Sequence, residues 1–258
     1  TVESILSKPD AGFIIEASFR EETRTCIGPD LATCPDCLTD LFNPDSRFYH
    51  YPFLTCAYCG PRFTITQALP YDRARTSMAS FAMCAACAKD YADPNNRRFH
   101  AQSLACPKCG PRLSMEPKEI AQAIRAGKII ALKGVGGFHL ICDARRNETV
   151  ARLRQRKNRD AKPFAVMIAN CAALSCIAIP TDSETQLIAS PAAPIVLMKP
   201  KPGLPQEIAP GLSRIGVFLA YVPIHHLLFS CLAEDAASGD GDVALVITSA
   251  NAGGEPLI

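Results

Sequence analysis

Four Cys-x-x-Cys pairs constrain the fold of this chain more than any other feature of its sequence. The chain holds 13 cysteines, and eight of them make up the pairs Cys34/Cys37, Cys56/Cys59, Cys84/Cys87 and Cys106/Cys109. Two such turns can direct four thiolates at one ion, and a closed four-sulfur shell is typical of structural zinc. The segment is poor in apolar residues, and zinc binding can supply about 10–16 kcal/mol toward folding. The pattern therefore predicts two structural zinc ions.

The cysteine segment is an internal duplication. Each of the eight cysteines recurs fifty positions later, His50 corresponds to His100, and Cys-Gly-Pro-Arg closes both units at 59–62 and 109–112. Two ligand groupings remain open: each repeat closes on itself, which we favour, or the outer pairs join and the inner pairs join. Since each ion already has four cysteines, we expect both histidines to make local hydrogen bonds.

Disulfides in an oxidising compartment are the alternative use of so many cysteines. The first residues, Thr1–Ser4, lack the basic and apolar regions of a secretory signal and lack an initiator methionine. No run of about 18 apolar residues predicts a membrane span. We therefore expect a reduced, cytoplasmic piece of a longer chain. A net charge of +2 does not favour DNA or double-stranded RNA as a partner.

The sequence changes character from Pro117 onward, where apolar runs alternate with amphipathic ones. Helices are expected at 117–126, from an N-capping Asn147 onward, and at 224–233. Apolar runs predict strands at 129–132, 164–168, 195–198, 216–219 and 243–247, the last buried on both faces. This alternation predicts a layered domain of the α/β or α+β class.

Three segments of this domain could carry chemistry. The glycine-rich segment Lys133–His139 could bring backbone N–H groups to an anion, or it could be only a tight strand exit. The run Arg145–Lys162 holds eight Lys and Arg. It could be a solvated helix face, but Lys157, Arg159 and Lys162 fall after the helix, where they could hold a polyphosphate.

The third segment, Thr248-Ser249-Ala250-Asn251, follows a buried strand. Small polar groups at the carboxyl ends of strands are where open sheets of this kind bind ligands. A plain strand-to-turn transition is the alternative.

Together these residues resemble the HypF family of carbamoyltransferases, which act in [NiFe]-hydrogenase maturation. The cysteine spacing matches the zinc module of that family. Further matches are Lys133–Leu140 with Cys142–Ala144, Lys157-x-Arg159 with Lys162-Pro163, and Ser249-Ala-Asn251. One departure is Ala220, where that family is expected to have proline.

The resemblance implies an α+β fold, with a small duplicated four-cysteine zinc-finger module followed by a YrdC-like open, twisted mixed sheet with helices. It implies three segments: 1–25 as the tail of an upstream acylphosphatase region, 26–115 as the zinc module, and 116–258 as a C-terminally truncated YrdC-like nucleotide-binding domain. The zinc module would be a rigid connector between catalytic domains.

The implied activity is ATP-dependent carbamoyl adenylation. Carbamate, released from carbamoyl phosphate by the upstream region, would join ATP to give carbamoyl adenylate. The carbamoyl group would pass to the C-terminal cysteine of a HypE-type partner and become the iron cyanide ligand. The piece alone is not expected to complete the overall reaction.

The resemblance also implies roles for residues of this chain. Lys157, Arg159 and Lys162 would bind the phosphates of ATP, with Mg²⁺. Thr248, Ser249 and Asn251 would hold the nucleotide. Lys133 and His139 would lie near the carbamate, and Lys157 and Arg159 would also stabilise the charge of the reaction.

Two rival interpretations remain. The first is a threonylcarbamoyl-adenylate synthase-like enzyme of tRNA modification, which leaves the eight cysteines unexplained. The second is a non-enzymatic zinc module that binds a protein or RNA.

Overall fold

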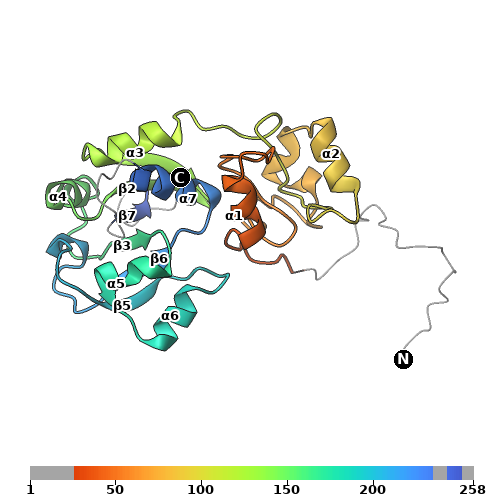
Figure 1. Ribbon diagram of the computed structural model, residues 1–258. Coiled ribbons are helices and arrows are strands. Elements are labelled where there is room, and N and C mark those ends of the chain that lie inside the picture. Colours follow the sequence, from red (N-terminus) through yellow and green to blue (C-terminus); the bar gives the residue numbers. More distant parts are fainter. Residues whose placement is uncertain (1–25, 235–242, 252–258) are drawn as a thin grey trace, which may run out of the picture.

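The computed structural model describes residues 26–234 and 243–251. The expected acylphosphatase tail at 1–25 lies outside the described residues, as do residues 252–258. Within the described part, two cysteine-rich repeats lie at one end of the molecule and a mixed sheet with its helices lies at the other (Figure 1). No helix in this part is long and apolar enough to cross a membrane.

The two repeats have the same local structure. The helices are α1 (Pro35–Phe42) and α2 (Ala85–Ala92), each beginning directly after a cysteine in the capping position, and the short helices η1 (Arg73–Arg75) and η2 (Ser77–Ser80) lie between them. His50 and His100 both adopt a left-handed backbone, with φ of 53° and 48°. Their backbone N–H groups donate to the carbonyls of Leu41 and Tyr91 in the last turns of α1 and α2, so the chain returns to the helix in the same way in both repeats.

The larger unit is built on seven strands among the described residues, in the order β1-β2-β7-β3-β6-β5-β4. Only β3 and β6 pair in parallel, so the sheet is mixed. The strands are β1 (Ile130–Gly134), β2 (Gly137–Asp143), β3 (Ala165–Ile168), β4 (Ala178–Ile179), β5 (Val196–Pro200), β6 (Ile215–Leu219) and β7 (Ala244–Ser249).

Helices pack on both faces of the sheet. Alternate strand residues point to opposite faces, so Leu132 and Ile247 pack with α3 (Pro117–Arg125) and α7 (Pro223–Glu234). Val166 and Val217 face the other way and pack with α4 (Asn147–Arg156). Shorter helices on the connections complete the unit, namely η3 (Cys171–Ala173), α5 (Leu174–Ile177), α6 (Asp182–Ile188) and η4 (Gln206–Ile208).

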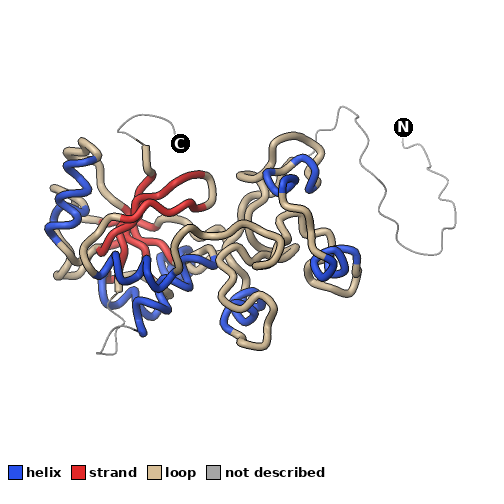
Figure 2. Tube along the Cα trace, turned by 90° about the horizontal axis from the view of Figure 1, so that it is seen from above, coloured by secondary structure: helices blue, strands red, loops and turns tan. Residues whose placement is uncertain are grey.

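The first repeat lies against the sheet unit, and the second lies farther away (Figure 1), and Figure 2 shows the loop-rich repeats beside the sheet. Leu227 of α7 is buried in the same apolar cluster as Cys37 and Leu54 of the repeat. The backbone of Thr33 donates to the carbonyl of Tyr221 at 2.9 Å, and that of Ala32 donates to Pro191 at 3.0 Å. Backbone bonds and apolar packing therefore both join the first repeat to the sheet.

The observed elements include α5, β4 and α6, which were not expected, and three further differences lie near the candidate site. The glycine-rich segment is a β-hairpin, with Lys133 near the end of β1 and His139 inside β2. The last strand extends through Thr248 and Ser249. Helix α4 begins at Asn147 with Arg146, not Asn147, in the capping position.

Candidate functional site

The sulfur atoms of the eight paired cysteines gather into two clusters, each made by one repeat. In the first, Cys34, Cys37, Cys56 and Cys59 have all four Sγ atoms within 4.8 Å of one another, and Cys84, Cys87, Cys106 and Cys109 do the same in the second. Each repeat therefore closes on itself. His50 and His100 are absent from both clusters, and their rings instead lie against Tyr49 and Tyr91.

The sulfur geometry fits a tetrahedral metal. Neighbouring Sγ atoms are 3.6–3.7 Å apart in the first cluster and 3.6–3.8 Å apart in the second. Sulfurs at about 2.3 Å from zinc in a tetrahedron lie about 3.8 Å from each other, whereas a disulfide would need about 2.05 Å. None of the thirteen cysteines, all of which lie among residues 26–234, forms a disulfide. Two four-cysteine clusters of this kind fit two structural zinc ions.

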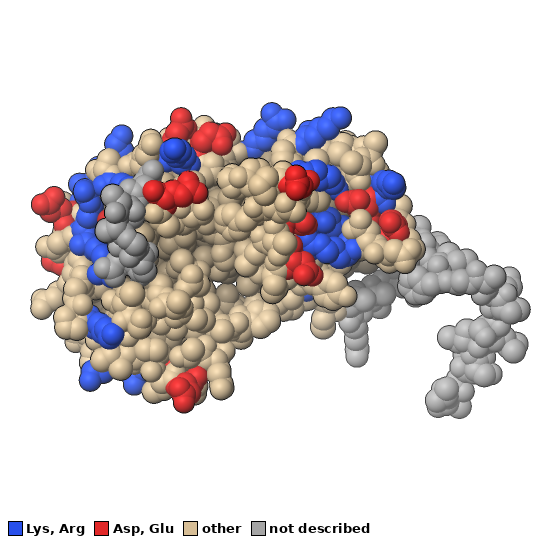
Figure 3. All heavy atoms as spheres, viewed as in Figure 1, with Lys and Arg blue, Asp and Glu red and all other residues tan. Residues whose placement is uncertain are grey.

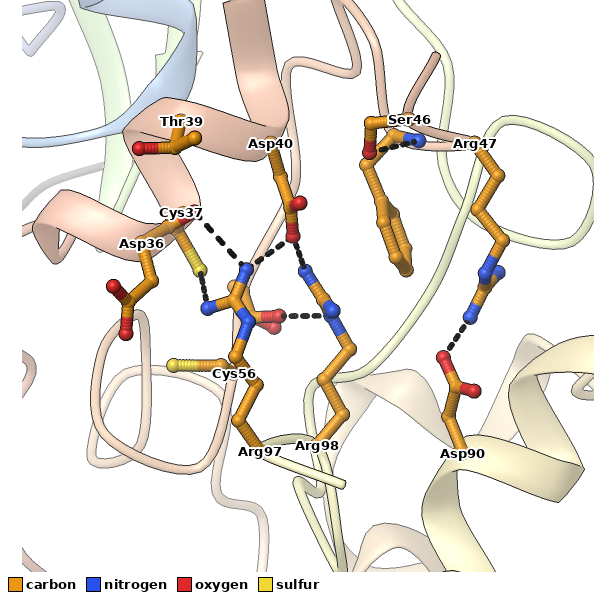
Figure 4. Close-up of polar contacts among 12 residues, drawn as sticks. Asp36, Cys37, Thr39, Asp40, Ser46, Arg47, Cys56, Asp90, Arg97 and Arg98 are labelled. Carbon is orange, nitrogen blue, oxygen red and sulfur yellow. Dashed lines mark hydrogen bonds and ion pairs between the residues drawn. The ribbon is translucent and has the colours of Figure 1, made fainter. Parts of the chain in front are cut away.

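An arginine from each repeat donates to a cysteine sulfur of the other repeat, and Figure 4 shows one of these two bonds, from Arg97 to Cys37. Arg97, from the second repeat, donates to Sγ of Cys37 at 3.1 Å, and Arg47, from the first, donates to Sγ of Cys87 at 3.2 Å. Arg97 is also paired with Asp40, and Arg47 with Asp90. The arginine, the aspartate and the cysteine of each contact recur fifty positions later in the sequence. Each repeat therefore gives an arginine to the metal cluster of the other, which we call the arginine exchange.

The contact between the repeats is completed by a second arginine. Arg98 is 5% exposed, lies over the Phe48 ring at 3.9 Å and pairs with Asp40. Burial alone would raise the pKa of Asp40, but hydrogen bonds from Arg98 and Arg97 hold it below its ordinary value. Asp40 is therefore an ionised bridge between the repeats.

A second candidate site lies at the end of β7, where cations from the α4–β3 connection meet the strand. The amino group of Lys157 donates to the backbone carbonyls of Ser249 and Asn251, both at 2.6 Å. Arg159 donates to Oγ1 of Thr248 at 3.0 Å. Figure 3 shows Lys and Arg side chains gathered at the α4 end of the molecule.

These cations also affect one another. Burial lowers the pKa of Lys157, and the neighbouring charges of Arg159 and Lys162 lower it further. Lys162 is exposed. Ser249 Oγ donates to Oδ1 of Asn251. Six residues were expected to bind the nucleotide. Hydrogen bonds join five of them, Lys157, Arg159, Thr248, Ser249 and Asn251, and the sixth, Lys162, lies near Lys157.

Lys133 and His139 do not come together. Lys133 pairs with Phe138 across the β1–β2 hairpin, and its amino group lies 4.7 Å from the centre of that ring. His139 pairs with Leu132, so its side chain is on the opposite face of the hairpin. Burial lowers the pKa of His139, which keeps its ring neutral.

A cavity of about 430 Å³ lies beside the end of β7. Among the expected site residues, His139, Thr248 and Ser249 line it. A volume of about 300–1,000 Å³ is usual for small-molecule sites. The cavity therefore has the size of a ligand site and adjoins the cationic cluster.

Sequence reasoning missed several residues of these sites. The fifty-residue repeat carries the signal for the arginine exchange, because Arg47 and Arg97 occupy equivalent positions, as do Asp40 and Asp90. Outside these sites, no comparable signal marks His225 of α7, which is fully buried and whose two ring nitrogens have no hydrogen-bond partner among the described residues.

Family comparisons match both parts of the chain. The HypF finger model matches residues 33–66 and 83–116, which hold the two cysteine clusters. The model described as telomere recombination, Sua5/YciO/YrdC, matches residues 122–258.

Relatives match nearly the whole chain. The carbamoyltransferase HypF of Rhizobium leguminosarum bv. viciae is 58% identical over 247 residues, 95% of this chain and 32% of its own length. The carbamoyltransferase HypF of Synechocystis is 50% identical over 94% of this chain and 34% of its own length.

Solved structures give the same result. A crystal structure of full-length HypF in the phosphate- and nucleotide-bound form has a TM-score of 0.81 and 44% identity, over 90% of this chain and 31% of that one. The T. kodakarensis HypF structure has a TM-score of 0.83 and 40% identity, over 92% of this chain and 32% of that one. This chain, which spans about a third of these relatives, belongs to the HypF carbamoyltransferase family and holds its zinc-finger and YrdC-like segments.

Proposed function

We propose that this chain is the part of a carbamoyltransferase that joins carbamate to ATP. In this reaction a carbamate oxygen attacks the α-phosphorus of ATP, the bond from that phosphorus to the bridging oxygen breaks, and pyrophosphate leaves with the electron pair. The observation that carries the proposal is the contact of Lys157 and Arg159 with the end of β7, beside a cavity of ligand size, with the charge of Lys162 close enough to lower the pKa of Lys157. Fixed cations stabilise the charge that builds in such a step.

The three cations have different roles in this proposal. Lys157 uses two of its three donors on backbone carbonyls, so it orders the Ser249–Asn251 segment and keeps one donor for a phosphate. Arg159 holds Thr248 in the same way. Lys162, which is exposed, is the most accessible of the three to a polyphosphate.

We propose that the cavity binds the carbamate. His139 lines it, and we propose that its neutral ring lies near the carbamate. Lys133 acts from the opposite face of the hairpin. Mg²⁺ would bind together with the phosphates of ATP in this proposal.

The wider reaction is proposed from the family. Carbamate would come from carbamoyl phosphate, and the carbamoyl group would go to the C-terminal cysteine of a HypE-type partner for the iron cyanide ligand of a hydrogenase. We propose a zinc module at 26–115, a nucleotide-binding domain at 116–258, an acylphosphatase tail at 1–25, and action in the cytoplasm. Full-length HypF bound to phosphate and nucleotide, at a TM-score of 0.81, supports nucleotide use.

ATP–pyrophosphate exchange tests the proposal. Exchange should depend on carbamate, and Lys157→Ala and Arg159→Ala should each lower it by about 10²-fold or more, the loss typical of a stabilising donor. Lys89→Ala, on the second repeat far from β7, is the control and should exchange normally. Undiminished nucleotide binding and exchange in both variants would rule out the phosphate role.

The exchange assay also tests the first rival, and binding measurements test the second. Exchange that requires threonine together with carbonate would favour a threonylcarbamoyl-adenylate synthase-like enzyme. A chain with no ATP binding that retains RNA or protein binding would favour the non-enzymatic zinc module.

A further inference from the structure

The cavity beside β7 has one wall that does not belong to the sheet unit. Its sheet side is formed by residues such as His139, Phe218 and Ile247. The opposite side is formed by the zinc module, through Asp30, Leu31, Ala32, Gly60 and Thr64. Figure 1 shows why this is possible, since the first repeat lies directly against the sheet unit.

Backbone hydrogen bonds hold this wall from both sides. Leu31 and Gly60 exchange N–H···O bonds of 3.1 and 2.9 Å, which tie the segment to the first repeat. Ala32 and Thr33 then donate to Pro191 and Tyr221 of the sheet unit. Because Gly60 directly follows Cys59, a zinc ion bound at the first cluster would order the wall.

Asp30 is the only carboxylate among the described residues that line the cavity, and no Lys or Arg is among them. Its Oδ1 accepts from the backbone N–H groups of Arg62 at 2.6 Å and Thr64 at 3.3 Å, and from the Thr64 hydroxyl at 3.2 Å. These bonds fix the carboxylate in place. Across residues 26–234 and 243–251, none of the hydrogen bonds to Asp30 uses Oδ2.

The second repeat has no equivalent role. No residue between 65 and 134, all of which the structure describes, lines this cavity. The positions fifty residues after Asp30 and Thr64 are Ser80 and Ser114, so the carboxylate is not repeated. Both repeats therefore hold a four-cysteine cluster, but only the first repeat contributes to the cavity wall.

We infer that the first zinc-binding repeat forms part of the ligand site, with Asp30 accepting a hydrogen bond from an N–H or O–H group of the ligand. This inference rests on the proposed function and adds to it. A carboxylate repels phosphates, so the polyphosphate stays at the Lys157 side. The donor group is either a ribose hydroxyl of the nucleotide or the amino group of the carbamate.

Binding measurements distinguish these two sources. If Asp30 meets the ribose, the parent protein binds ATP at least tenfold more tightly than 2′,3′-dideoxy-ATP, and Asp30→Ala binds both equally weakly. If it meets the carbamate, Asp30→Ala binds ATP normally, but the carbamate concentration for half-maximal ATP–pyrophosphate exchange rises at least fivefold. Thr64→Val should show a smaller change in the same direction.

Matched controls guard against a general loss of structure. Ser114→Ala changes the residue equivalent to Thr64 in the second repeat, and Asp45→Asn removes an exposed carboxylate of the first repeat; both should bind and exchange like the parent. Unchanged ATP affinity, ribose discrimination and carbamate dependence in Asp30→Ala would overturn the inference while leaving the proposed function standing.

A second experiment does not depend on ligand binding. Amide hydrogen exchange of Leu31, Ala32 and Thr33 should accelerate at least tenfold in Cys59→Ser and less in the equivalent Cys109→Ser. Full retention of amide protection in Cys59→Ser would show that the first zinc does not order the wall. A parent protein that binds no nucleotide would instead contradict the proposed function, and the exchange result would still decide the role of zinc in the wall.

Discussion

At the scale of single residues, the arginines at the metal centres balance charge. Zn²⁺ with four thiolates carries a net charge of −2, and burying that charge without a partner is unfavourable. Arg47 and Arg97 each place a guanidinium against one thiolate, and a charge-assisted bond of this kind is stronger than a neutral one. Since each arginine belongs to the opposite repeat, the stability of each zinc site depends on both repeats.

Arg97→Ala should accelerate zinc release from the first site, and Arg47→Ala from the second. Loss of such an outer partner typically costs 10–100-fold in metal affinity. The measurement is zinc transfer to a chromogenic chelator, in which each variant should show one fast and one slower phase. Arg75→Ala, whose side chain bonds to Leu69 and Asp72 and to no cysteine, is the control. Release curves for Arg97→Ala and Arg47→Ala that match the parent would exclude the charge-balancing role.

At the scale of elements, the β1–β2 hairpin orients His139 toward the cavity. A Cβ added at Gly134 would lie 2.5 Å from Nδ1 of His139 and 2.7 Å from its Cε1. Gly134 therefore provides the space that the imidazole ring occupies. The glycine here serves close packing, and its backbone has no left-handed φ.

Gly134→Ala should displace the His139 ring and destabilise the fold by about 1–3 kcal/mol, the usual cost of overpacking. Chemical unfolding measures the free energy, and the imidazole NMR signals of His139 report the displacement. Gly28→Ala is the control, because its added Cβ would approach only Arg62, at 3.6 Å. An unmoved His139 signal in Gly134→Ala would contradict this role.

The elements also show what the sequence could and could not predict. The cysteine spacing predicted both metal sites, because a Cys-x-x-Cys turn is local and needs no distant partner. Helix α3 and strand β7 followed from their apolar periodicity. Residues Gly137–His139 were missed as strand because glycines and a charged neighbour hide the alternation. The separation of Lys133 from His139 depends on hairpin register, which the sequence does not specify.

Ala220 stands where the resemblance led us to expect proline. The bond from Ala220 N–H to Ile168 at 2.9 Å shows why alanine suits that position, since proline has no N–H.

At the scale of the whole molecule, α7 joins the two units. Leu228 packs on the sheet, while Leu227 packs among the cysteine repeats. His225, on the same helix, is fully buried, and the centre of its ring lies 4.9 Å from that of Tyr221 in an edge-on arrangement. Burial, with smaller effects from His226 and His139, lowers the pKa of His225 to about 3.

This buried histidine should make the joined structure sensitive to acid. The folded protein keeps His225 neutral down to about pH 3, whereas the unfolded chain takes up a proton near pH 6.5. The unfolded state therefore binds more protons between these values, and stability falls as the pH drops below about 6.5. The free energy of unfolding of His225→Phe, measured by denaturant titration at several pH values, should fall less steeply than that of the parent.

A graded comparison separates this effect from protonation of the cysteine ligands, which acts on all variants alike. Burial lowers the pKa of His226 to about 4, so His226→Phe should reduce the acid sensitivity by a smaller amount. Identical slopes of stability against pH in the parent and His225→Phe would show that His225 does not determine the acid limit.

The arginine exchange between the repeats also gives the duplicated module a two-fold symmetric interface. The contacts Arg47 to Cys87 and Arg97 to Cys37 are the same contact made twice in opposite directions, and Phe48 and Arg98, at equivalent positions, touch each other where the two halves meet. A contact that maps onto itself in this way is the pattern of an isologous dimer. The two repeats therefore pack against each other as the two subunits of a homodimer do, although they belong to one polypeptide, and the pair of Phe48 and Arg98 departs from that symmetry.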